Sequence, residues 1–123
     1  MLSVAGRRIS DEAGLAALRR WAQGVGDSTD EASSVRYTLQ LLRHRAPGSS
    51  VEVRVPPWGA VQAIEGTTHT RGTPPAVVEM SPQVWLELVT GSHTFENAVA
   101  AGLIHASGER SNLSAWFPLV GLP

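Results

Sequence analysis

The chain has 123 residues and contains neither cysteine nor lysine. The absence of cysteine excludes disulfides, thiolate metal ligands and cysteine nucleophiles, and it is typical of a reducing compartment. Because all ten cationic residues are arginine, Schiff-base catalysis and a phosphate-loop lysine are also excluded. No apolar run approaches the roughly 20 residues that span a bilayer, so we expect no integral membrane segment.

The usual catalytic and metal-binding patterns are missing as well. No Gly-x-Ser-x-Gly motif occurs, and the four histidines, at positions 44, 69, 93 and 105, show no i, i+4 spacing. The formal net charge of −1 argues against general binding to nucleic acid, which normally requires a basic face. We therefore predict no catalytic residues, no metal site, no cofactor and no nucleic-acid partner.

The length of the chain fits a single domain, residues 1–123, with one ordinary core. Hydrophobic residues make up 42% of the sequence and charged residues 17%, which is typical of a globular protein. The first six residues are too few for a secretory hydrophobic region, and Arg7 and Arg8 follow them in the reverse order of a signal peptide. We expect a cytoplasmic protein.

Residues 1–48 read as a helical segment. Ser10 is a typical capping residue for a first helix that ends near two glycines. Ser28, with Glu31 three residues later, predicts a capping box at the start of a second helix. The Pro-Gly pair at 47–48 predicts its end.

Three strands are predicted in the middle of the chain. Residues 51–55 alternate strictly between valine and charged residues, so the valines face a core. A turn then leads to a second strand at 60–65, which we expect to form a hairpin with the first. A third strand, 76–80, runs into a helix capped by Ser81 with Pro82 in its first position. We expect these strands to form a meander.

The last third of the chain contains four short units, at 81–91, 94–102, 103–108 and 111–118, which read as helix, helix, strand and helix. The three helical units share an apolar triad at i, i+3 and i+4, which predicts one buried face on each. The triads are Trp85, Leu88 and Val89; Phe95, Ala98 and Val99; and Leu113, Trp116 and Phe117.

These residues carry a resemblance to a known family. Ser-Pro-x-x-Trp-Leu-x-Leu-x-x-Gly at 81–91 and Phe-x-x-Ala-x-x-x-Gly at 95–102 precede a strand ending in Ser-Gly and a closing apolar segment. This order resembles the carboxy-terminal half of sterol carrier proteins. The runs 53–62 and 69–75 further resemble the small stand-alone actinobacterial branch of that family. The resemblance covers roughly residues 50–120.

The resemblance implies an α+β fold in which a mostly antiparallel sheet of four to five strands is covered by about five helices. In that family a single layer of helices encloses an apolar cavity, and the members carry sterols, fatty acyl groups or other lipids. The implied function is non-catalytic binding of a lipid-like small molecule. The implied lining residues are Trp85, Leu88, Val89, Phe95, Val99, Ile104, Leu113, Trp116 and Phe117.

The same residues are also those of an ordinary packed core, and a triad at helical spacing is more often core than cavity wall. The rival interpretation is therefore an interaction module with a filled core and no ligand, which binds a protein through the turn at Trp58 or through the loop after residue 66. A third interpretation is that the chain is an accessory domain of a thiol- or CoA-dependent enzyme, as related domains suggest. Trp116 and Phe117 are the strongest candidates for ligand contact, because a closing segment is the least anchored lid.

The loop around His69, Arg71 and Gly72 is the second candidate site. An arginine beside a flexible glycine can present its guanidinium and backbone N–H groups to an anionic head group. A solvated loop explains the same residues more simply.

Arginines also gather near the amino terminus, at positions 7, 8, 19 and 20, against two acidic residues in the same stretch. Such a cluster can meet an anionic surface or a partner, although a solvated helix face is the simpler interpretation. The first two helices can also pair with a second copy of the chain, so a homodimer is a possible partner state.

Overall fold

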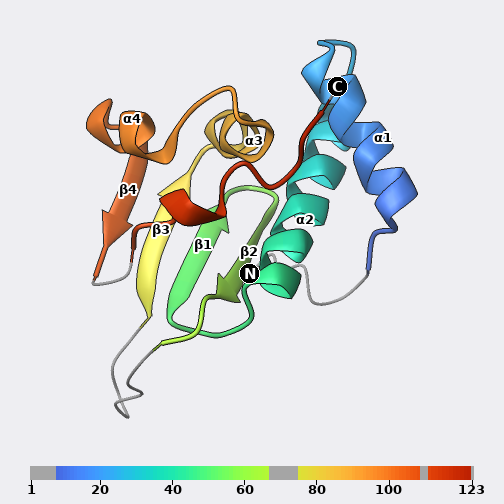
Figure 1. Ribbon diagram of the computed structural model, residues 1–123. Helices are drawn as coiled ribbons and strands as arrows, with labels where there is room; N and C mark the ends of the chain where they lie inside the picture. Colours follow the sequence, from blue (N-terminus) through green and yellow to red (C-terminus); the bar gives the residue numbers. More distant parts are fainter. Residues whose placement is uncertain (1–7, 67–74, 109–110, 123) are drawn as a thin grey trace.

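The computed structural model describes residues 8–66, 75–108 and 111–122 (Figure 1). Two helices come first, followed by two strands, a third strand, two shorter helices and a fourth strand. The elements are α1 (Asp11–Ala22), α2 (Ser28–Arg45), β1 (Val51–Val55), β2 (Gly59–Ala63), β3 (Ala76–Met80), α3 (Pro82–Thr90), α4 (Phe95–Ala100), β4 (Ile104–Ser107) and a single 3₁₀ turn, η1 (Ser114–Trp116).

The four described strands form one open sheet in the order β2-β1-β3-β4. The hairpin between β1 and β2 is antiparallel, as the sequence predicts, and β3 and β4 are also antiparallel. The predicted meander is wrong, because β3 lies parallel to β1 rather than beside β2. The antiparallel β2 brings the chain back to the end of the sheet where β1 begins, because Ala63 and Ala76 both pair with Val51. The connection from β2 to β3 therefore only has to pass that end of β1.

The helix starts follow from local capping. Ser10 and Ser81 accept hydrogen bonds from the backbone N–H groups of Ala13 and Val84, as their positions predict. The cap of α2 differs from the prediction: Asp27 is the N-cap and forms a reciprocal capping box with Asp30. A shorter carboxylate at N3 satisfies the box as well as glutamate does, which leaves Glu31 free to bind elsewhere.

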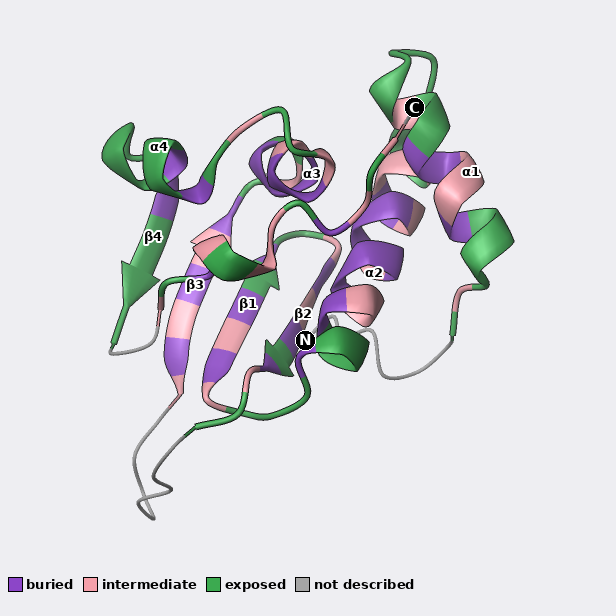
Figure 2. Cartoon of the chain, in the orientation of Figure 1, coloured by how far each residue is buried: buried purple, intermediate pink, exposed green. Residues whose placement is uncertain are grey.

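The helices cover one face of the sheet. Val51, Val53 and Val55 of β1 are fully buried toward α2 and α3, whereas Glu52 and Arg54 point to the opposite face. Figure 2 shows the buried residues gathered on the sheet, α2 and α3, while α4 is mostly exposed. The α+β class with a mostly antiparallel sheet is therefore confirmed, with four α-helices and one 3₁₀ turn in the described part of the chain.

The last described segment, residues 111–122, is called the C-terminal strap. The predicted helix over 111–118 is wrong, since only the turn Ser114–Trp116 forms. Pro118 explains this, because the residue before a proline is disfavoured in the helical region, and Phe117 is extended with φ −107° and ψ 147°. The rest of the strap crosses α3, where the N–H groups of Leu119 and Val120 donate to the Val89 carbonyl at 2.9 and 3.1 Å.

Candidate functional site

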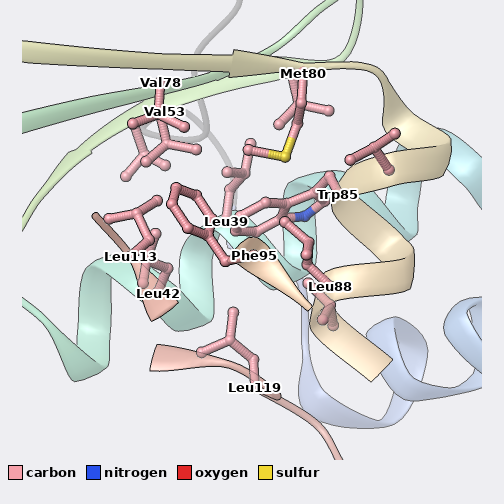
Figure 3. Packing of buried hydrophobic residues seen from close by; sticks show 14 of the residues in the cluster. Leu39, Leu42, Val53, Val78, Met80, Trp85, Leu88, Phe95, Leu113 and Leu119 are labelled. Atoms are coloured by element: carbon pink, nitrogen blue, oxygen red, sulfur yellow. The ribbon is translucent and has the colours of Figure 1, made fainter. Parts of the chain in front are cut away.

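The implied lining residues converge beneath the sheet. Six of the nine are buried in the interior between the sheet, α3, α4 and the strap (Figure 3). In Figure 3, Trp85 and Phe95 lie between the strand residues Val53, Val78 and Met80 and the strap residues Leu113 and Leu119. The six buried residues are Trp85, Leu88, Val89, Phe95, Ile104 and Leu113.

Phe117 joins the strap to this interior. Its ring lies 5.6 Å from the Trp85 ring in an edge-to-face arrangement and 6.4 Å from the Phe95 ring in a stacked one. Trp116 and Phe117 are only partly buried, so the strap covers the interior with aromatic side chains that also reach solvent.

A buried polar contact fixes the orientation of Trp85. Its indole N–H donates to the Thr38 hydroxyl at 2.7 Å, and that hydroxyl in turn donates to the Ser34 carbonyl at 2.7 Å. Both Trp85 and Thr38 have 0% exposure. Sequence reasoning missed Thr38, although its spacing from Val35 and Leu42, at i+3 and i−4, places it on the buried stripe of α2.

Val99 does not share the interior with the other residues. Its side chain is 41% exposed, so the prediction that it lies on the buried face of α4 is wrong. The helix spans only six residues and presents Phe95 and Ala98 inward. Val99 follows Ala98 by one position, which is about 100° around the helix and toward solvent.

The second candidate site cannot be placed. His69, Arg71 and Gly72 lie outside the described residues. The turn at Trp58 is described, and it is tied to α2: the Trp58 indole N–H donates to Glu31 at 2.8 Å, and the Arg36 Nε donates to the Trp58 carbonyl at 3.0 Å. The Arg36 guanidinium also lies 5.7 Å from the Trp58 ring centre. These contacts give Trp58 a structural role in joining the hairpin to α2.

Surface hollows lie outside this interior. One of about 240 Å³ lies on the open face of the sheet beside Glu52 and Glu79. Another of about 740 Å³ lies between the α1–α2 turn and α3. A third of about 530 Å³ lies between α1, α2 and the end of the strap, and it is bordered by several arginines.

No group of three or more histidine or acidic side chains in the described ranges has the geometry to hold a metal ion. Among the helices of the described chain, none combines the length and the apolar character that crossing a bilayer requires.

Comparison with known proteins identifies the family. Residues 27–119 match the family model described as bacterial SCP ortholog, which covers more than half of the chain. The chain therefore belongs to the bacterial orthologues of the sterol carrier proteins, as the motifs in its carboxy-terminal half predict. No curated protein matches the chain. The family assignment points to a role like that of a lipid carrier.

Proposed function

We propose that the protein binds or carries an apolar ligand, without catalysis, in the interior between the sheet and the C-terminal elements. The observation that supports this most directly is the strap, whose Phe117 ring rests against Trp85 and Phe95 while remaining partly exposed. A ligand that enters beneath the strap moves this ring aside and packs against it, as well as against the aromatic and aliphatic interior. The proposed ligand residues are those implied by the family resemblance, apart from the exposed Val99.

The chemistry of the interior suits a neutral or acyl ligand portion. The residues of the core cluster around Trp85 are apolar and carry no charge. The polar N–H of the Trp85 indole is hydrogen-bonded to the Thr38 hydroxyl. Each methylene group buried there stabilises the complex by about 0.8 kcal/mol. Affinity therefore grows with the length of the apolar chain rather than with its head group.

The strap is the natural route of entry. It contains one turn of regular structure and is held to α3 through the Val89 carbonyl. A hydrogen bond from the Arg45 guanidinium to the Leu119 carbonyl ties it to α2. Segments with few backbone hydrogen bonds open locally at a small fraction of the global unfolding free energy, as ligand lids do.

Native mass spectrometry of the purified protein, followed by organic extraction, tests the proposal. We expect a stoichiometric apolar molecule, or uptake of one on incubation with fatty acids, acyl thioesters or sterols. Phe117→Ala should weaken that uptake, while Val99→Ala, a change of an exposed side chain on α4, should leave it unchanged. An apo mass that persists through all three incubations contradicts the proposal.

One observation favours a second candidate function. Trp85, Leu88 and Leu113 have 0% exposure, so the interior is already filled by the protein's own side chains. An interaction module with this filled core needs no ligand. It predicts that Phe117→Ala lowers stability without changing the uptake of any lipid.

A further inference from the structure

The hollow of about 530 Å³ between α1, α2 and the strap has a different chemistry from the interior, and it is called here the basic hollow. Its volume falls within the range of about 300–1,000 Å³ that is typical of small-molecule sites. Among the described residues, three arginines, one histidine and one aspartate, Asp11, border it. Its apolar wall consists of Leu15, Leu41, Leu119, Val120 and Leu122.

The basic hollow is elongated along α1. Asp11, Leu15 and Arg19 border it at positions i, i+4 and i+8, so they lie on one face of the helix and span about 12 Å. At the Asp11 end, the Tyr37 hydroxyl donates to the Asp11 carboxylate at 2.7 Å. Among the described residues of the border, Asp11 carries the one carboxylate, and this hydrogen bond occupies part of it, so the arginines are the dominant charges there.

Hydrogen bonds anchor the backbone next to Arg8. The Gln40 side chain accepts a hydrogen bond from the Ile9 N–H at 2.9 Å and donates to the Ile9 carbonyl at 2.8 Å, and Arg8 borders the hollow one residue before Ile9. His44 and Arg45 come from the last turn of α2. Arg45 uses one of its five N–H donors for the Leu119 carbonyl, so others remain for a ligand.

From this arrangement we propose that the basic hollow binds an amphipathic monoanion. The anionic head group lies at the end formed by Arg8, His44 and Arg45, and an extended apolar chain follows the leucine wall between α1 and the strap. A carboxylate is suited to the guanidinium donors. This site is separate from the interior of the proposed function, and it rests on its own observations.

Calorimetric titration with laurate, a fatty acid of twelve carbons, tests the proposal. Arg8→Gln removes one charge from the head-group end and should weaken laurate binding about fivefold, the upper range for an exposed ion pair. Arg43→Gln removes the same charge beside His44 but outside the hollow. This control should change laurate affinity by less than about twofold.

Two further probes separate the head group from the chain. Dodecanol keeps the chain without the charge, so it should bind more weakly than laurate and should not respond to Arg8→Gln. Inorganic phosphate keeps an anionic head without the chain, and a tenfold excess over laurate should not displace it. Equal binding of laurate and dodecanol, or full displacement by phosphate, overturns the proposal.

Phe117→Ala distinguishes the two sites, because Phe117 contacts the interior and does not border the basic hollow. If Arg8→Gln weakens laurate binding and Phe117→Ala does not, the hollow is a site whatever the fate of the interior. If only Phe117→Ala weakens binding, the interior site stands and the basic hollow is not a laurate site. Absence of laurate binding to the wild type also overturns the proposal.

Discussion

The interior beneath the sheet and the basic hollow on the side of α2 that faces α1 are built from opposite kinds of residue. Trp85, Leu88 and Leu113 have no exposure, and their neighbours are apolar. Arg8, Arg19 and Arg45 border an open space and are exposed. A ligand in the first region therefore has to move the protein's own side chains apart, whereas in the second it adds contacts that the chain does not make by itself.

The strap connects the two regions. Its first half contributes Leu113 and Phe117 to the interior, and its end, from Leu119 to Leu122, forms one wall of the basic hollow. Hydrogen bonds to the Val89 carbonyl and from Arg45 hold the point where these halves meet. Opening the strap therefore exposes the interior and removes a wall of the hollow at the same time.

The largest effect should come from emptying the interior. Trp85→Ala removes a fully buried indole and leaves the buried Thr38 hydroxyl without its donor, so we expect a loss of about 3–5 kcal/mol in the free energy of unfolding. Val99→Ala, on the exposed side of α4, should stay within about 0.5 kcal/mol. Urea unfolding measures both, and similar losses in the two variants contradict a filled interior.

A smaller effect should follow from crowding the contact between α1 and α2. Gly14→Ala would favour an isolated helix by about 1 kcal/mol, but its new methyl group would clash with the Tyr37 ring, which is 2% exposed. We therefore expect a net loss of about 1–3 kcal/mol in stability, as overpacking usually gives.

A double variant tests the cause of that loss. Tyr37→Leu shortens the side chain beneath Gly14, so Gly14→Ala should cost less in this background than in the wild type. An equal cost in both backgrounds would show that α1 does not pack on Tyr37 in this way.

The smallest effect should appear at alkaline pH. Burial, and secondarily the hydrogen bond to Asp11, raise the pKa of Tyr37 to about 12 from its ordinary value of 10.0. A raised folded-state pKa means that this stabilisation is fully present below pH 10 and is lost as the pH rises from 10 to 12. The expected loss is on the order of 1–2 kcal/mol after allowance for solvent screening.

The composition makes this measurement clean. The chain has no lysine, no cysteine and one tyrosine, so Tyr37 is the one side chain whose ordinary pKa lies near 10. Unfolding midpoints of the wild type should fall across this range, and those of Tyr37→Phe should stay flat. Parallel decline in the two proteins would show that Tyr37 is not responsible.

Much of the fold could be predicted because local signals agreed with the tertiary structure. Alternating valines placed β1 and its buried face, and Ser81 with Pro82 placed the start of α3. The position of β3 beside β1 could not be predicted from the sequence. The strand with which β3 pairs depends on which side of the hairpin the connection after residue 63 reaches. The helix predicted over 111–118 does not form, because Pro118 disfavours a helical Phe117. This local signal is present in the sequence, but the prediction followed the apolar triad instead.

The candidate sites could be predicted only in part. The aromatic triads identified Trp85, Phe95 and Phe117, but whether they enclose a space or fill it depends on packing that no spacing determines. The amino-terminal arginines were visible as a charge cluster. The sequence did not show that neighbouring arginines have different surroundings. Arg20 pairs with Asp30 at 2.8 Å, whereas Arg19 borders the basic hollow.

The most direct test of the central claim uses the four tryptophan indole N–H signals in a nuclear magnetic resonance titration, with a long-chain fatty acid as the ligand. The Trp116 indole lies on the strap, that of Trp85 is bonded to Thr38 inside, and that of Trp58 is bonded to Glu31 at the hairpin. We expect saturable shifts at Trp116 and Trp85 and none at Trp58. Unmoved Trp116 and Trp85 signals at saturating ligand would contradict entry beneath the strap.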